Sequence, residues 1–203
     1  MIQKVTAFIT RRQRDARQLL LFRHPLAGTQ VPAGTVEEGE GLQDALRREV
    51  REETGLDLAD AAHLGVWANE LAATERVTLG AAPLLAGPAA DAAELAAVGR
   101  GVSMPFFGER GAYSQVLYQI IEDGGESLRP ARGWVATKDL SAVKERHFYH
   151  VPCAEKTPDS WRLRGDQDLV YELFWTPLRP KPALVEGQDR WLDFVYPALH
   201  RPA

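Results

Sequence analysis

The segment LQDALRREVREET, residues 42–54, has the spacing of an amphipathic helix. At about 100° per residue, Leu46 and Val50 fall on the same side as the first leucine, and this side predicts a core-facing surface. Gly41 is an acceptable N-cap, and Gly55 stands where a left-handed C-terminal cap is expected. The sequence therefore predicts a helix over residues 42–54 that packs on a core through its leucines.

Three glutamates of this segment break the amphipathic rule. On the same projection Glu49 and Glu53 lie within about 20° of the leucine direction, and Glu52 lies about 80° from it. A solvated acidic face is the usual interpretation of such a run, but here Arg47 and Arg51 already occupy the water-facing side. Carboxylates that turn inward are costly unless a cation lies among them. Hard carboxylate oxygens suit Mg²⁺, Mn²⁺ or Ca²⁺, so the sequence predicts a metal site on this helix that serves phosphate chemistry.

Arg48 and Glu40 stand beside these carboxylates. Arg48 falls close to Glu52 on the projection and can hold its carboxylate by a forked hydrogen bond. Glu40 precedes the helix and can hold Arg48 in turn. The alternative for both residues is ordinary surface pairing, which contributes little to stability.

The stretch from Gly34 to Leu56 resembles the signature of the Nudix hydrolases. That signature requires a glycine, five residues, a glutamate, seven residues, and then Arg-Glu-apolar-x-Glu-Glu-x-Gly-apolar. Every fixed position is met without a gap, by Gly34, Glu40, Arg48, Glu49, Val50, Glu52, Glu53, Gly55 and Leu56.

The resemblance implies an α/β fold, the Nudix α/β/α sandwich with a mixed β-sheet. It also implies hydrolysis of a diphosphate linkage in a nucleoside diphosphate derivative, with Mg²⁺ or Mn²⁺ as the cofactor. Carried over by position, it makes Glu49, Glu52 and Glu53 catalytic residues and metal ligands. Glu49 or Glu53 is implied to help deprotonate the attacking water, and Arg48 to orient Glu49 or Glu52.

Residues before and after the helix extend the expected site. The resemblance implies the carbonyl oxygen of Ala33 as a further metal ligand, and a role for Gly34 in letting its loop approach the metal closely. Arg23 and His24 end the preceding strand and face either substrate phosphate or solvent. A further acid is expected from residues 154–168, which offer Glu155, Asp159, Asp166 and Asp168.

The surrounding strands and the last helix fit the family's sandwich, so the resemblance extends over two parts of the chain. The expected organisation is a Nudix hydrolase domain over residues 1–74 and 144–203, with an inserted β-rich subdomain over residues 75–143. Within the insert, GWVATKDL at residues 133–140 is similar to the closing segment of bacterial SH3-like domains. The alternative is an enlarged loop with a hairpin over the active site. We expect the insert to supply substrate selectivity or the contact of a homodimer.

Periodicity and turn residues predict the other elements. Residues 28–34 and 154–168 are predicted to be loops. Strands are predicted at 4–10, 19–22, 63–70, 99–109, 113–122, 146–151 and 169–176, and a second helix within 187–199.

Composition limits the class of protein. With a net charge of −4, the chain lacks the excess of basic residues that is typical of nucleic-acid-binding proteins. The single cysteine, Cys153, rules out an intramolecular disulfide, indicates a reducing compartment, and is expected to be a small buried hydrophobe. No stretch approaches the ~18 apolar residues of a membrane span, and the N-terminus lacks the pattern of a signal peptide. The expectation is a soluble cytoplasmic protein without nucleic-acid or membrane partners.

Two other functions compete with hydrolysis. One is a catalytically inactive nucleotide-sensing or regulatory protein with the Nudix fold, against which the intact signature speaks. The other is an isomerase of isoprenoid diphosphates, against which the position of Cys153 speaks. Residues typical of particular substrates are mostly absent, so the expected partner is a small-molecule nucleotide diphosphate derivative of open class.

Overall fold

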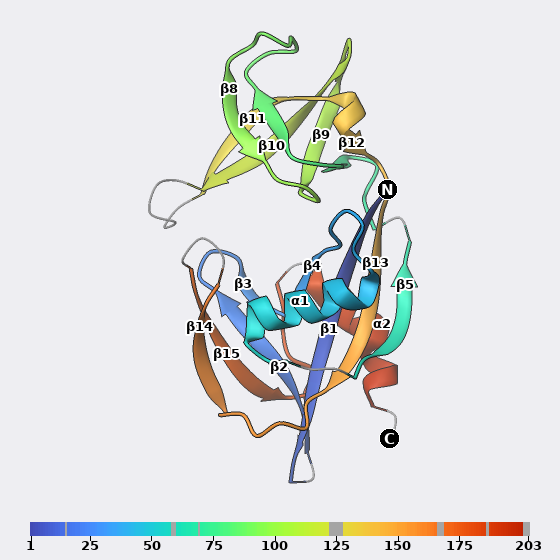
Figure 1. The fold of residues 1–203 in the computed structure, drawn as a ribbon, viewed down its shortest axis with the longest axis vertical. Coiled ribbons are helices and arrows are strands. Elements are labelled where there is room, and N and C mark those ends of the chain that lie inside the picture. Colours follow the sequence, from blue (N-terminus) through green and yellow to red (C-terminus); the bar gives the residue numbers. More distant parts are fainter. Residues whose placement is uncertain are drawn as a thin grey trace. The chain divides into compact units, whose positions relative to one another are not determined.

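The computed structural model describes residues 1–14, 16–57, 60–68, 70–121, 128–165, 169–185 and 187–200. The chain divides into two compact units (Figure 1). One consists of Met1–Lys4 and Trp67–Arg146, and the other of Val5–Val66 and His147–Ala203.

The first sheet is accompanied by two helices, as expected of an α/β fold. Among the described residues its strand order is β14 (Ser160–Arg164), β15 (Val170–Pro177), β2 (Ala16–His24), β1 (Ile2–Gln13), β13 (Lys144–Pro152) and β5 (Ala62–Trp67). The short strands β3 (Gly28–Gln30) and β4 (Ala33–Thr35) pair with β2 and β1. The helices are α1 (Leu42–Thr54) and α2 (Gln188–Leu199).

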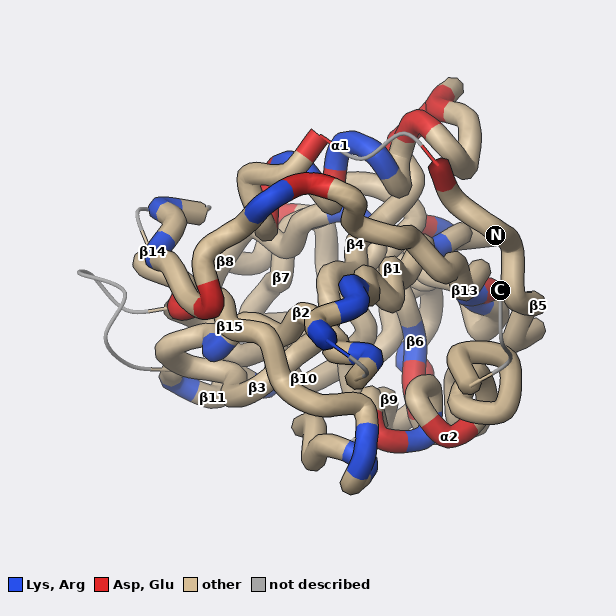
Figure 2. The backbone as a smooth tube through the Cα atoms, turned by 90° about the horizontal axis from the view of Figure 1, so that it is seen from below, with Lys and Arg blue, Asp and Glu red and all other residues tan. Residues whose placement is uncertain are grey.

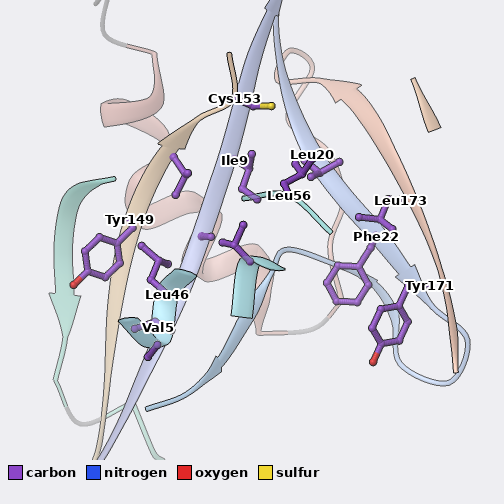
Figure 3. Packing of buried hydrophobic residues seen from close by; sticks show 14 of the residues in the cluster. Val5, Ile9, Leu20, Phe22, Leu46, Leu56, Tyr149, Cys153, Tyr171 and Leu173 are labelled. Carbon is purple, nitrogen blue, oxygen red and sulfur yellow. The ribbon is translucent and has the colours of Figure 1, made fainter. Parts of the chain in front are cut away.

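The two helices contact opposite faces of this sheet. Phe148 of β13 contacts Phe194 of α2, with ring centroids 5.3 Å apart. The next residue, Tyr149, belongs instead to the core cluster that contains Leu46 and Val50 of α1. Because successive side chains of a strand point to opposite faces, α1 and α2 lie on opposite sides of the sheet. Figure 3 shows the packing on the α1 side, and the fold is the predicted α/β/α sandwich.

The second sheet lies in the unit that consists of Met1–Lys4 and Trp67–Arg146. Its order, among the described residues, is β12 (Leu140–Ser141), β6 (Glu75–Thr78), β9 (Ser103–Arg110), β10 (Tyr113–Ile121), β11 (Leu128–Ala136), β7 (Ala82–Leu85) and β8 (Glu94–Val98). A short 3₁₀ helix, η1 (Thr137–Asp139), precedes β12. A Cβ atom at Gly133 would lie 2.6 Å from Cγ of Leu84, so the glycine of the GWV sequence permits close packing of β11 on β7. The likeness of this segment to SH3-like domains stays a prediction.

A buried group of charges belongs to the same unit. Arg146 Nε donates to Glu70 Oε1 at 2.6 Å, and Lys144 Nζ lies 3.2 Å from Glu70 Oε2. All three side chains are at most 10% exposed. Two cations around one carboxylate hold the pKa of Glu70 below its ordinary value despite burial, which acts in the opposite direction.

The structure confirms most of the predicted elements and corrects others. Helix α1 has the predicted bounds. The predicted loop at 28–34 is wrong in part, because it contains β3 and the start of β4. The predicted loop at 154–168 contains β14, whose Trp161 and Leu163 alternate with arginines as in a half-buried strand. Strands β7 and β8 were not predicted, because they lie in the stretch 81–97, where alanine, leucine, proline and glycine dominate and no strand periodicity stands out.

Figure 2 shows acidic and basic residues mixed along the described backbone. Within the described ranges, neither helix combines the length and apolar character needed to cross a membrane.

Replacement of Leu46 tests the predicted core side of α1. Leu46 is 3% exposed, so Leu46→Ala should leave a cavity and lower the free energy of unfolding by about 2–5 kcal/mol. Arg47→Ala, one residue further on the exposed side, should change it by less than about 0.5 kcal/mol. Urea unfolding of both variants measures the difference, and equal effects would contradict the assigned orientation of the helix.

Candidate functional site

Helix α1 turns its apolar residues and Glu49 toward the protein interior. Ala45, Leu46, Val50 and Thr54 are buried. The side chain of Glu49 is 13% exposed, as expected from its place beside the leucines.

The other two glutamates are more accessible to solvent. Glu53 is half-buried, whereas the side chain of Glu52 is 48% exposed because this residue lies at the edge of the core-facing side. The inward orientation expected of the three carboxylates is therefore graded, strongest for Glu49 and weakest for Glu52.

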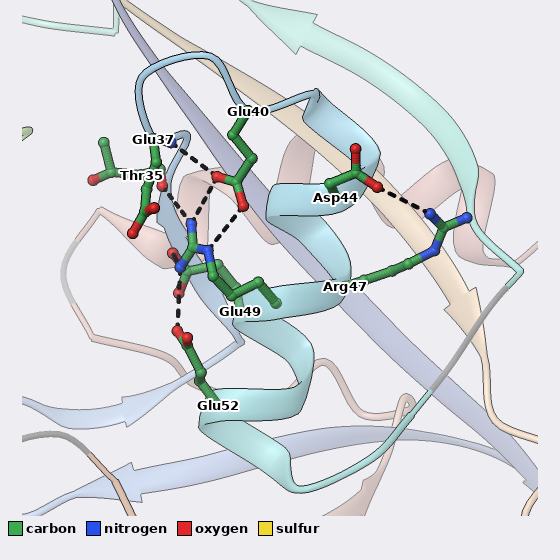
Figure 4. Close-up of polar contacts among 8 residues, drawn as sticks. Thr35, Glu37, Glu40, Asp44, Arg47, Glu49 and Glu52 are labelled. Atoms are coloured by element: carbon green, nitrogen blue, oxygen red, sulfur yellow. Dashed lines mark hydrogen bonds and ion pairs between the residues drawn. The ribbon is translucent and has the colours of Figure 1, made fainter.

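The guanidinium of Arg48 joins the helix to the segment before it (Figure 4). Its Nε and Nη2 donate to the two carboxylate oxygens of Glu40, each at 2.9 Å. Its Nη1 donates to Glu49 Oε1 at 2.9 Å and to Glu52 Oε2 at 3.1 Å. Nη2 also donates to the carbonyl oxygen of Thr35 at 2.9 Å. One cation thus orients three carboxylates and a backbone carbonyl, a use of the planar fork that lysine cannot reproduce.

The charges within this network stabilise one another. The hydrogen bond from Arg48 holds the pKa of Glu40 below its ordinary value, and the bond to Glu40 raises the pKa of Arg48. Glu40 Oε2 also accepts the backbone N–H of Glu37 at 2.9 Å. The carboxylate therefore fixes the turn that leads into α1 while it remains ionised.

Two contacts connect the helix to strand β4. Glu53 Oε2 accepts the backbone N–H of Ala33 at 2.8 Å. A Cβ atom at Gly34 would lie 1.8 Å from both Cδ and Oε1 of Glu49, so no side chain fits at this position beside the carboxylate as it stands. Ala33 and Gly34, both singled out in the sequence, therefore lie directly against the glutamates of α1.

These residues offer the oxygen donors that a hard divalent cation prefers, but their side chains do not converge on one point. Carboxylate and carbonyl oxygens are the donors that Mg²⁺ and Mn²⁺ take. Within the described parts of the chain, however, no three His, Cys, Asp or Glu residues converge in a group that could hold a metal. The reason is visible in the contacts: Glu49 and Glu52 turn toward Arg48, and Glu53 turns toward the N–H of Ala33.

The other predicted residues have separate environments. Asp159 pairs with Arg11, which lowers the pKa of this carboxyl group. Asp166 and Asp168 lie outside the described residues. Cys153 is buried in the core cluster, and burial raises the pKa of its thiol, which disfavours the nucleophilic thiolate.

Arg23 and His24, at the end of β2, point to opposite faces of the sheet. Arg23 pairs with Glu172 at 3.0 Å and lines a cavity of about 320 Å³ together with residues of β14 and β15. His24 contacts Tyr171, which belongs to the core cluster on the α1 side. Only His24 of the pair therefore faces the side of the sheet that carries α1.

Sequence reasoning missed the backbone groups of the network, the carbonyl of Thr35 and the N–H of Glu37. Backbone donors and acceptors carry no residue-type signal, so only the folded turn shows them.

Comparison with known proteins gives a match over part of the chain. Residues 2–82 match the model of the NUDIX domain. No curated protein matches the chain.

Two solved structures align with the chain at low sequence identity. The NUDIX domain of Shewanella oneidensis NrtR, complexed with ADP ribose, is 12% identical with a TM-score of 0.50; the alignment covers 98% of this chain and 88% of that one. An Ap4A hydrolase from C. elegans, in a binary complex, is 12% identical with a TM-score of 0.44 and 98% coverage of both chains.

Replacement of Gly34 tests the contact with Glu49. Gly34→Ala should displace the Glu49 carboxylate from its hydrogen bond with Arg48 and cost about 1–3 kcal/mol in the free energy of unfolding. Gly80→Ala is the matched control, because a Cβ at Gly80 meets no atom within 4 Å. Denaturant unfolding compares the two variants. A native-like stability of Gly34→Ala would contradict the close contact.

The pH dependence of stability tests the bond between Arg48 and Glu40. Because the pKa of Glu40 lies below its ordinary 4.5 in the folded protein, its contribution is present above pH 4.5 and is lost as the pH falls through the folded-state pKa. Glu40→Gln should therefore lower stability at pH 7 by about 1 kcal/mol, and the difference from the native protein should shrink below pH 4.5.

Thermal unfolding between pH 7 and pH 3 measures this difference. Glu38→Gln, an exposed acid of the same turn, is the control and should show no such trend. A constant difference for Glu40→Gln across the range would mean that its ionisation plays no part.

Proposed function

We propose, from the match of residues 2–82 to the model of the NUDIX domain, that the protein hydrolyses a diphosphate linkage in a nucleoside diphosphate derivative. The observation that carries the proposal is the network in which Arg48 orients Glu49 and Glu52 beside Gly34. The pattern of carboxylates at i, i+3 and i+4 gives a cluster of negative charge whose simplest use is to bind a cation that in turn binds phosphate.

We propose that Glu49, Glu52 and Glu53 hold Mg²⁺ or Mn²⁺, with the carbonyl oxygen of Ala33 as a further ligand. When bound, the metal neutralises the diphosphate charge and lowers the pKa of water. The close contact at Gly34 places the loop backbone beside Glu49.

The protein's own residues supply position and a base. Arg48 holds Glu49 and Glu52 at fixed angles, which removes the need to order them when substrate arrives. Glu49 or Glu53 accepts the proton of the attacking water. Both side chains are less exposed than that of Glu52.

The expected substrates are small nucleotide derivatives. The Shewanella oneidensis NUDIX domain that shares this fold is complexed with ADP ribose, so ADP-ribose belongs in a first panel beside nucleotide sugars, nucleoside triphosphates and dinucleoside polyphosphates. We also propose that residues 1–74 and 144–203 act as the hydrolase domain and that the insert at 75–143 sets substrate preference or forms a homodimer contact.

Hydrolysis by paired variants tests the proposal. Glu53→Gln keeps the shape of the side chain and removes its charge, so it should lower kcat by about 10²–10⁴-fold. Asp44→Asn, on the exposed side of the same helix, should retain the native rate. Turnover of the panel with Mg²⁺ and with Mn²⁺ is the measurement.

Two outcomes would contradict the proposal. Equal activity of Glu53→Gln and the native protein would remove the helix from catalysis. Tight nucleotide binding without turnover by the native protein would favour the sensing function over the hydrolase.

A further inference from the structure

The side chain of His24 is held in one protonation form by the turn that follows it. Its Nδ1 lies 3.1 Å from the backbone nitrogen of Leu26 and 3.1 Å from that of Ala27. Both backbone groups are donors, so Nδ1 must be the acceptor and carries no proton. The neutral ring therefore carries its proton on Nε2.

The sheet places His24 on the face that carries α1. Leu20 and Phe22 precede it by four and two residues on β2, and both belong to the core cluster that contains Leu46. Alternate residues of a strand share a face, so His24 continues this row. Arg23, between Phe22 and His24, points to the other face and pairs with Glu172.

A chain of contacts connects His24 with the end of α1 that carries Glu53. The His24 ring lies 5.3 Å from the Tyr171 ring, centroid to centroid. Tyr171 is the register partner of Leu163 on β14. Leu163 Cδ1 would lie 3.6 Å from a Cβ at Gly55, the residue that caps α1.

A second contact fixes β14 against the same end of the helix. Trp161 Nε1 donates to the carbonyl oxygen of Thr54 at 3.0 Å. His24 is thus separated from the last turn of α1 by the Leu163–Tyr171 pair.

The Nε2–H of His24 is available to a ligand. Among the described residues, none accepts a hydrogen bond from this atom, and the residue is half-buried at the strand end. Burial also lowers the pKa of His24, so the ring is an uncharged donor at neutral pH. An uncharged donor forms no ion pair with a carboxylate, in contrast to an arginine.

We propose that His24 Nε2 donates a hydrogen bond to a phosphoryl oxygen of the substrate and is a positioning residue of the α1 site. This inference rests on the proposed function, since a diphosphate supplies the acceptor. Phosphoryl oxygens are the strongest acceptors that such a substrate offers, and a partly buried donor gains most from them. A bond of this kind is made in the bound substrate as well as in the transition state, so its loss should raise KM more than it lowers kcat.

His24→Asn separates the two functions of the ring. Asparagine Oδ1 takes the place of Nδ1 and can accept the same backbone N–H groups, but nothing replaces Nε2–H. The expected result is a native-like Tm, a KM raised by about 2–10-fold, and a kcat within about twofold of native. Arg23→Ala, the neighbouring residue on the opposite face, is the control and should leave KM unchanged.

A measurement of the imidazole itself does not depend on turnover. In protein labelled with ¹⁵N-histidine, long-range ¹H–¹⁵N correlation should show His24 as the neutral Nε2–H form at pH 7. Addition of an α,β-methylene nucleoside diphosphate with Mg²⁺ should shift the Nε2 resonance.

These readouts separate failure of this inference from failure of the proposed function. Turnover with no change of KM in His24→Asn and no Nε2 shift would overturn the role of His24 and leave the hydrolase intact. An Nε2 shift without turnover would support the contact and overturn hydrolysis. A proton on Nδ1 at pH 7, or a fall in Tm of His24→Asn with KM and kcat changing together, would overturn the positioning role.

Discussion

The candidate site depends on one guanidinium. Arg48 contacts Glu40 before the helix, Glu49 and Glu52 on it, and the carbonyl of Thr35 at the end of β4. Without this cation the helix would bring like charges together at i and i+3, which is unfavourable in a partly dehydrated place. With it, the turn from β4 into α1 and the carboxylates of α1 are ordered by the same group. The arrangement also explains why Glu49 and Glu52 turn to Arg48, whereas Glu53 turns to the N–H of Ala33.

The sheet determines which residues can take part in that site. Its α1 face carries the core cluster, and this face ends at His24 on β2 and Tyr171 on β15. The opposite face carries Arg23, whose charge is already shared with Glu172. Two polar residues that are adjacent in sequence therefore lie on different faces with different contacts, and the alternation of a strand is sufficient to separate them.

The sequence predicts the local parts of this structure well. The bounds of α1 follow from its apolar spacing and from glycines at both ends, and the set of carboxylates around Arg48 follows from their spacing on one helix. The helix bounds and the contacts of Arg48 are both determined by residues close in sequence.

Features that depend on distant pairing were not predicted. Glu70 finds its partners at Lys144 and Arg146, more than seventy residues away, and nothing in the local sequence identifies them. Strand β14 was taken for a loop because a polar, proline-containing segment precedes it, although its alternation of apolar residues with arginine was present. Strand β7, which begins with alanine and proline, forms because the neighbouring strand β8 supplies hydrogen bonds. Amino-acid composition does not reveal such a partner.

The contact between Gly34 and Glu49 has a consequence for how this chain can vary. The two positions share one volume, since the space that a side chain at residue 34 would fill is the space that holds the carboxylate of residue 49. A larger residue at position 34 therefore requires the carboxylate of residue 49 to leave this space and its hydrogen bond with Arg48. The residue type allowed at position 34 and the placement of the carboxylate at position 49 are therefore coupled, although the two residues are fifteen positions apart in the chain.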